Sequence, residues 1–136
     1  MPRILADTNV LISALISPHG SPALLLERLR DGAFELIVSP KLLNELLGVL
    51  TRRKFRSYVT PLEARRYVVW LRHVGLLIPD PDVASVSTPD PADDFLVAVA
   101  RAGKATAIVS GDRHLTKLPE LDPPVFTPGA ALRRLS

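Results

Sequence analysis

Two aspartates of this 136-residue chain close short apolar segments that are typical of buried strands. Asp7 follows residues 3–6, and Asp112 ends the segment 106–112. In an open parallel sheet, ligands collect outside the carboxyl ends of the strands, so both carboxylates stand where a site is expected. A lone aspartate after a strand is usually a helix cap or a turn residue. Two of them at one sheet edge favour a shared site instead.

A predicted helix that begins near Asp93 adds a third carboxylate. The residues three, four and seven positions after Asp93 are leucine, valine and alanine, so Asp93 points along the packed face of this helix. Asp94 lies about 100° round the helix, in line with Arg101, and is the more solvent-directed of the two. Asp90 is either the cap of this helix or an acid that supports the site. We count Asp90 and Asp94 as supporting residues.

Glu45 is a fourth acidic candidate, on the flank of a leucine stripe in the predicted helix that follows Ser39 and Pro40. The pattern alone leaves open whether Glu45 belongs to a site or to the helix surface. Carboxylates about 5 Å apart repel by about 3 kcal/mol at an effective dielectric constant of 20, so four of them would take up protons unless a divalent cation neutralised them. Such an oxygen-rich site favours Mg²⁺ or Mn²⁺ over Zn²⁺, activates water and binds a phosphodiester.

Composition bounds the remaining possibilities. With 47% hydrophobic and 23% charged residues, the chain is predicted to form a single globular domain over residues 1–136. The absence of cysteine excludes disulfides, thiolate metal sites and a cysteine nucleophile, and points to a cytoplasmic protein. The apolar N-terminal stretch is interrupted by polar residues and does not resemble a signal peptide, and no membrane span is expected.

The net charge is only +3, but basic residues are concentrated in one segment. Arg52, Arg53 and Lys54 lead a cluster that continues with Arg56, Arg65 and Arg66, and this cluster predicts binding of a polyanion such as RNA. A solvated arginine-rich surface explains the same residues equally well.

The elements that must position these residues alternate between strand and helix. This alternation predicts parallel strands joined by helical crossovers, and hence a three-layer α/β/α sandwich with a central parallel sheet. No glycine-rich phosphate loop is present. Strands are predicted over residues 3–6, 34–39, 75–79, 106–112 and 124–126, with helices over 10–15, 24–29, 40–50, 61–73, 93–102 and 128–135.

Two of the predicted helices are rich in leucine, at residues 24–29 and 42–50. They carry more leucine than one face of a small sheet is expected to cover. We therefore expect a homodimer, with part of this surface available to a helix of a partner protein.

Four segments together resemble a known family. The segments "ILADTNVLISAL", "SPKLLNELLGVLTRRKF", "DPADDFLVAVARAGKATAIVSGDRHL" and "PVFTPGAALRRL" are similar, in order and spacing, to PIN-domain proteins, specifically to the VapC-like toxins of toxin–antitoxin pairs. The resemblance covers nearly the whole chain. It implies a metal-dependent ribonuclease that hydrolyses single-stranded RNA, inhibited by a cognate antitoxin.

The resemblance also assigns the site. The family's acidic quartet falls on Asp7, Glu45, Asp93 and Asp112. The family's third acid stands seven residues before an alanine, which fits Asp93 and Ala100, whereas Asp94 reaches Arg101. Thr8, Asn9 and Ser110 are implied to support the site by hydrogen bonds, with Ser110 standing where relatives often carry threonine.

Three other classes account for part of the pattern. A haloacid-dehalogenase-type phosphoryl transferase would need a second acid where Asn9 stands, and a response-regulator receiver would need adjacent acids before Asp7. A PIN-like scaffold that binds nucleic acid or a partner without cutting is the remaining alternative. It has no reason to retain four mutually repelling acids.

Overall fold

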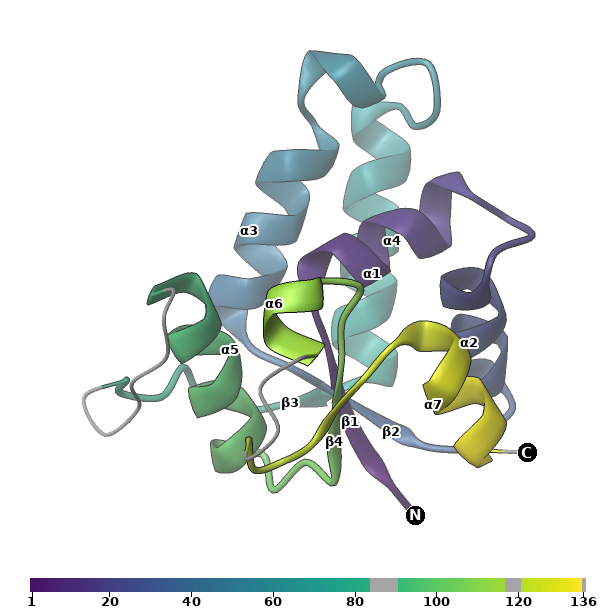
Figure 1. Ribbon diagram of the computed structural model, residues 1–136. Coiled ribbons are helices and arrows are strands. Elements are labelled where there is room, and N and C mark those ends of the chain that lie inside the picture. Colours follow the sequence, from purple (N-terminus) through teal and green to yellow (C-terminus); the bar gives the residue numbers. More distant parts are fainter. Residues whose placement is uncertain (84–90, 117–120, 136) are drawn as a thin grey trace.

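The structure is a computed structural model in which residues 1–83, 91–116 and 121–135 are described (Figure 1). Its centre is a five-stranded parallel sheet with the order β3-β2-β1-β4-β5. The strands are β1 (Arg3–Ala6), β2 (Glu35–Val38), β3 (Leu76–Leu77), β4 (Ala107–Val109) and β5 (Val125–Phe126). The helices are α1 (Thr8–Ile16), α2 (Ser21–Arg30), α3 (Pro40–Leu50), the 3₁₀ turn η1 (Arg53–Phe55), α4 (Pro61–Val74), α5 (Pro91–Ala102), α6 (Arg113–Thr116) and α7 (Pro128–Leu135).

The strand order places a topological switch point between β1 and β4. From β1 the chain proceeds to β2 and β3 on one side, whereas β4 and β5 extend the sheet on the other. At such a point the crossovers diverge and leave a crevice at the carboxyl ends of the two strands. Asp7 follows β1 and Asp112 follows β4, so the fold brings both residues to this crevice.

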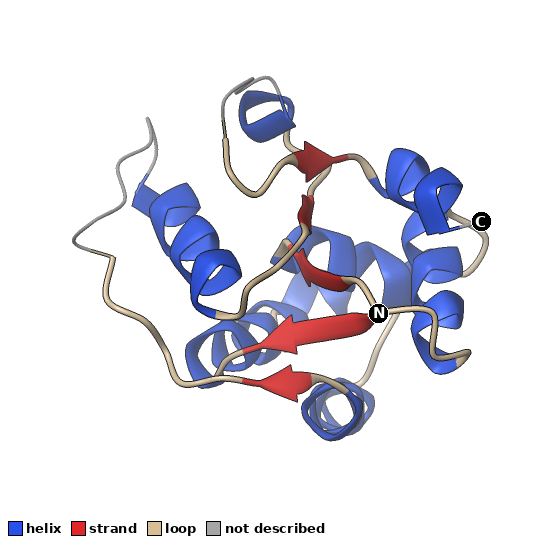
Figure 2. Cartoon of the chain, turned by 90° about the horizontal axis from the view of Figure 1, so that it is seen from below, coloured by secondary structure: helices blue, strands red, loops and turns tan. Residues whose placement is uncertain are grey.

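Helices cover both faces of the sheet, which confirms the predicted three-layer sandwich (Figure 2). Helix α5 contacts β1, β2 and β4 on one face. Its end lies so close to the sheet that a Cβ on Gly103 would approach the Ile37 side chain to 2.7 Å. Side chains alternate along a strand, so Leu36 and Val38 face the opposite layer, where α4 contacts β2.

The predicted caps of α3 and α4 are present. Ser39 Oγ accepts a hydrogen bond from the Leu42 N–H at 3.3 Å, with Pro40 in the first helical turn. Thr60 and Glu63 form the reciprocal capping box that begins α4. The backbone N–H of Thr60 donates to the Glu63 carboxylate, which lowers the pKa of Glu63.

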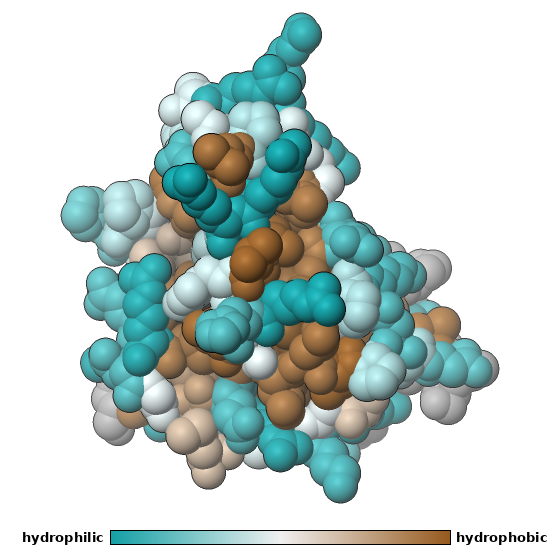
Figure 3. All heavy atoms as spheres, turned by 180° about the vertical axis from the view of Figure 1, so that it is seen from behind, coloured by the Kyte–Doolittle hydropathy of each residue, from teal (hydrophilic) through white to brown (hydrophobic). Residues whose placement is uncertain are grey.

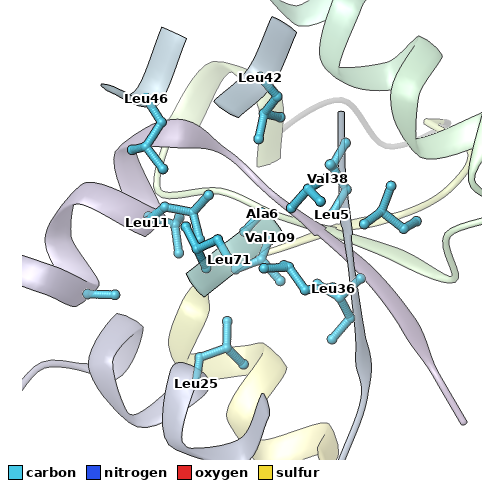
Figure 4. Packing of buried hydrophobic residues seen from close by; sticks show 14 of the residues in the cluster. Leu5, Ala6, Leu11, Leu25, Leu36, Val38, Leu42, Leu46, Leu71 and Val109 are labelled. Carbon is cyan, nitrogen blue, oxygen red and sulfur yellow. The ribbon is translucent and has the colours of Figure 1, made fainter. Parts of the chain in front are cut away.

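The core is continuous across the sheet and the helices (Figure 4), where Leu25, Leu36 and Leu71 come from α2, β2 and α4. It corrects one expectation from the sequence. The helices pack on one another as well as on the sheet, so the chain itself buries nearly all the leucines that were expected to be in surplus; only Leu24, at 43%, is markedly exposed. The buried ones are Leu25, Leu26, Leu29, Leu42, Leu43, Leu46 and Leu50.

Two short elements were not predicted, because neither α6 nor η1 is long enough to show a hydrophobic period. Within the described residues, no single helix is long and apolar enough to cross a membrane. Only the pair α1 and α2, bent by 93° between them, meets the criteria of length and composition, which buried core helices also meet.

Candidate active site

Asp7 occupies the N-cap position of α1 without acting as its cap. The side chain makes no capping hydrogen bond. The backbone N–H of Asp7 instead donates to the Val109 carbonyl at 2.9 Å, which extends the pairing of β1 with β4 by one residue. The Asp7 carboxylate is therefore held at the end of a rigid strand and is not used to begin the helix.

Ser110 joins the ends of β1 and β4. Its hydroxyl donates to Asp7 Oδ2 at 3.0 Å, and the same oxygen accepts the Asp112 N–H at 3.0 Å. Ser110 is fully buried, at 0% exposure, so its hydroxyl exchanges these partners for water only at a cost. One side chain thus fixes both the carboxylate of Asp7 and the backbone of Asp112.

The crevice at this edge is a cleft of about 290 Å³. Among the described residues, four carboxylates line it, and they come from four separate parts of the fold: the end of β1, α3, the first turn of α5 and the segment after β4. These residues are Asp7, Glu45, Asp93 and Asp112.

The two adjacent acids of α5 differ in position. Asp93 lines the cleft, whereas Asp94 is not among its described lining residues. This is the orientation that the apolar spacing after Asp93 predicts, and the residues that share its direction, Leu96 and Ala100, are buried. Asp90 lies outside the described residues.

Glu45 reaches the cleft from α3 and is exposed. Within the described part of the chain its carboxylate forms no hydrogen bond and no ion pair. Thr8 and Asn9 also line the cleft, and their side chains likewise form no hydrogen bond with other described residues. The rigid half of the site is therefore Asp7, Ser110 and Asp112, and the open half lies on α3.

The basic segment lies elsewhere. Figure 1 shows α3 and α4 side by side, extending beyond the rest of the molecule, with η1 at the far end. Arg52, Arg53 and Lys54 are exposed there. We call residues 40–74 the α3–α4 arm and residues 51–60 its tip; none of the three basic residues is among the lining residues of the cleft.

Sequence reasoning missed the apolar wall of the cleft, formed by Leu42, Phe95 and Leu96. Phe95 is the notable omission, because it is only partly buried beside the acids. Its signal was its place directly after the two adjacent aspartates, at the start of the apolar run 95–100.

The donor set of the cleft suits a hard divalent cation, because it consists of carboxylate oxygens and contains no sulfur ligand. Among the described residues, no three acidic or histidine side chains are close enough together to enclose one ion. This arrangement fits Mg²⁺, which usually retains several waters and binds through one or two carboxylates together with substrate phosphates.

Comparison with known proteins places this geometry in a family. The sequence profile of the PIN domain matches residues 3–114, so the chain belongs to the PIN-domain family, as its sequence motifs indicate. PIN domains are generally nucleases that use divalent metal ions.

Individual proteins are also similar to this chain in sequence or in fold. The uncharacterized protein MJ1680 of Methanocaldococcus jannaschii is 29% identical over 117 residues, which cover 85% of this chain and 74% of that protein. The fold is shared with a chain of VapBC2 from Rickettsia felis, solved bound to a DNA fragment from their promoter, with a TM-score of 0.62, 17% identity, and 92% and 98% of the two chains covered. PAE2754 from Pyrobaculum aerophilum has a TM-score of 0.66 at 16% identity, with 98% and 89% covered.

Proposed function

We propose that this protein is an Mg²⁺- or Mn²⁺-dependent endoribonuclease that hydrolyses phosphodiester bonds of single-stranded RNA. The observation that carries the proposal is the cleft at the β1–β4 switch point, where Asp7, Glu45, Asp93 and Asp112 converge from four parts of the fold. Mutually repelling carboxylates destabilise a protein unless a cation binds between them, so their retention in one cleft favours metal-dependent chemistry.

The four acidic residues have different roles, according to how firmly each is held. Asp7 and Asp112 are fixed by Ser110 at the strand ends and define where a cation binds. Asp93 adds a carboxylate from the first turn of α5, and the exposed Glu45 is free to adjust to a substrate or to orient a water for attack. When bound, a divalent ion supplies the positive charge that the scissile phosphate requires and activates water for in-line attack.

The tip of the α3–α4 arm supports the choice of an RNA substrate. Arg52, Arg53 and Lys54 are exposed on an element that projects from the body, and Glu45 lies on the same helix that leads to them. A strand held by its phosphates at the tip can extend along the arm to the cleft. Such contacts give affinity that decreases with salt and carry no sequence preference.

The deciding experiment measures cleavage of a fluorescently labelled single-stranded RNA by the purified full chain. We expect cleavage in Mg²⁺ or Mn²⁺, none in excess chelator, and recovery when the metal is restored. Binding without any cleavage, with every divalent ion tried, would instead establish the PIN-like binding module.

We further propose that the protein is the toxin of a cytoplasmic toxin–antitoxin pair and acts as a homodimer. The dimer proposal now rests on α4, because Leu62, Val69 and Val74 are 54%, 65% and 40% exposed. Figure 3 shows the face opposite to that of Figure 1, where hydrophobic side chains gather at the centre among hydrophilic ones. Light scattering of the full chain tests the dimer, and Val69→Glu should shift it to a monomer.

The antitoxin proposal has its own test. Co-expression with the product of the neighbouring reading frame should yield a stable complex in which RNA cleavage is lost. Cleavage at the free enzyme's rate in that complex would contradict the proposal.

A further inference from the structure

Phe95 is an aromatic ring placed among acids. It lines the cleft together with Asp93 and Glu45 and remains partly exposed, whereas the five residues that follow it on α5 are buried. A ring contributes nothing to binding a hard cation, which takes oxygen ligands. Its exposure beside a cleft that has room for a substrate therefore requires another reason.

Lys41 is held over this ring. Its Nζ lies 4.3 Å from the centroid of Phe95, and within the described residues the ammonium pairs with no carboxylate. The backbone N–H of Lys41 donates to both oxygens of Asp80, at 3.1 and 3.2 Å, which fixes the first turn of α3. Lys41 is four residues before Glu45, so both lie on the same side of this helix.

We propose that Lys41 and Phe95 form a binding subsite for one nucleotide of a single-stranded nucleic acid, beside the acidic cleft. Lys41 binds a phosphate of the strand, and a base stacks on the side of the Phe95 ring that faces the cleft. The proposal rests on the proposed function, because it positions the strand for the chemistry of the four acids.

Two physical requirements favour this arrangement. A polyanionic strand approaching four carboxylates is repelled, and an exposed ammonium at the edge of the cleft offsets part of that repulsion. A base must also be held away from the scissile bond, and stacking on an aromatic side chain does this for any base. Lys41 supplies the positive charge and Phe95 supplies the stacking surface. The contact between them holds the two side chains in a fixed relative position.

A merely structural role is the competing explanation, because the same cation–π contact also joins α3 to α5. The chain contains a matched control for it. Arg134 lies 4.2 Å from the centroid of Phe126, a second cation over a phenylalanine ring, in the pocket at the opposite edge of the sheet. Arg134→Gln and Phe126→Leu therefore remove a contact of the same kind far from the acids.

The experiment measures steady-state cleavage of a short single-stranded RNA and, in chelator, its binding by fluorescence anisotropy. Lys41→Gln and Phe95→Leu should each raise KM and Kd by about tenfold while kcat changes little, since the first removes a phosphate-binding charge and the second a stacking surface. Lys41→Arg should restore wild-type KM, and the two control variants should leave KM and Kd unchanged.

Substrates with a single abasic position locate the stacked base. In a series of such substrates, one abasic position near the scissile bond should weaken binding to the wild-type protein. The same substrate should bind Phe95→Leu as tightly as the intact RNA does. The subsite would be overturned if every abasic position weakened RNA binding equally in the wild type and in Phe95→Leu. An unchanged KM in Lys41→Gln would also overturn it. If the wild type binds RNA but never cleaves it, the proposed nuclease fails, while the abasic scan still decides whether the subsite exists.

Discussion

The two edges of the sheet carry pockets of nearly equal size and opposite chemistry. The carboxyl edge holds the cleft of about 290 Å³ with its four acids. The amino edge holds a pocket of about 270 Å³ lined largely by apolar groups, among them Ile4, Phe126, Ala131 and Leu135. The volume of a pocket is therefore a poor guide to function in this protein.

The difference follows from how the chain runs through a parallel sheet. Every strand points its carboxyl end at the same edge, so the residues that turn the chain into helices, which are short and polar, gather there. At the amino edge the chain re-enters from helices, and α7 packs its apolar face on β5 instead. Predictions can therefore be chosen to disturb one edge and leave the other unchanged.

The largest effect is expected from Asp93→Asn. It removes one negative charge from the cleft with little change in size, so cleavage should fall by about a hundredfold or more because metal binding weakens. Asp94→Asn, one residue along the same helix, should lower cleavage by a factor at least about tenfold smaller, because Asp94 is not among the described residues that line the cleft. Cleavage rates measured over a range of metal concentrations test this, and equal losses in both variants would contradict the assignment.

Neutralising the tip of the arm should act on binding alone. Replacement of Arg52, Arg53 and Lys54 by glutamine should weaken RNA affinity by about tenfold or more, and lower the salt slope by about 0.7 for each phosphate that the protein no longer neutralises. The rate of the chemical step in single-turnover assays should stay the same. A change in that rate with an unchanged salt slope would show that the tip does not bind phosphates.

Ser110→Ala tests the rigid half of the site. Loss of the hydroxyl leaves the Asp112 N–H without its partner and releases the Asp7 carboxylate, so activity should fall by about tenfold and the free energy of unfolding by about 1–2 kcal/mol. Ser110→Thr keeps the hydroxyl and should restore activity. Urea unfolding and cleavage assays on the same preparations separate the two effects.

Filling the apolar pocket at the amino edge should change stability and leave cleavage unchanged. Ala131→Leu adds methyl groups to the amino-edge pocket, so stability should rise by about 1 kcal/mol while cleavage stays unchanged. Thermal unfolding gives the first quantity. Reduced cleavage by a well-folded variant would show that the two edges are coupled.

The smallest effect concerns pH. Burial raises the pKa of Tyr67 above its ordinary value of 10.0, and its hydroxyl donates to the Leu11 carbonyl at 2.7 Å, which joins α4 to α1. Because the folded state holds the proton more tightly, this stabilisation is complete below pH 10 and is lost progressively above it. Tyr67→Phe should be less stable by about 1 kcal/mol near neutral pH, and the gap should close above about pH 10. Urea midpoints of both proteins at the two pH values give the result.

The sequence predicted those features that depend on local spacing. The strand–helix alternation, the caps of α3 and α4, and the orientation of Asp93 follow from residues within about two helical turns. Whether Glu45 reaches the cleft depends on how α3 packs against the rest of the chain. The residue pattern of α3 alone therefore left its role undecided. The family resemblance was needed to select it.

The expectations that failed are those that require knowledge of tertiary packing. The leucines of α2 and α3 seemed to exceed what a sheet could cover because helix-on-helix packing cannot be read from either helix alone. Phe95 was likewise not singled out, since an aromatic residue in an apolar run is ordinarily part of the core. Only the described cleft distinguishes it from its buried neighbours.

The hydrogen bond between Ser110 and Asp7 joins residues 103 positions apart in the chain. A ribosome synthesises Ser110 only after all the residues that separate it from Asp7, and β1 has no β4 to pair with until then. The cleft therefore cannot form before β4 and Ser110 have been synthesised. A chain with this architecture has no assembled cleft until its ribosome has passed β4 and Ser110.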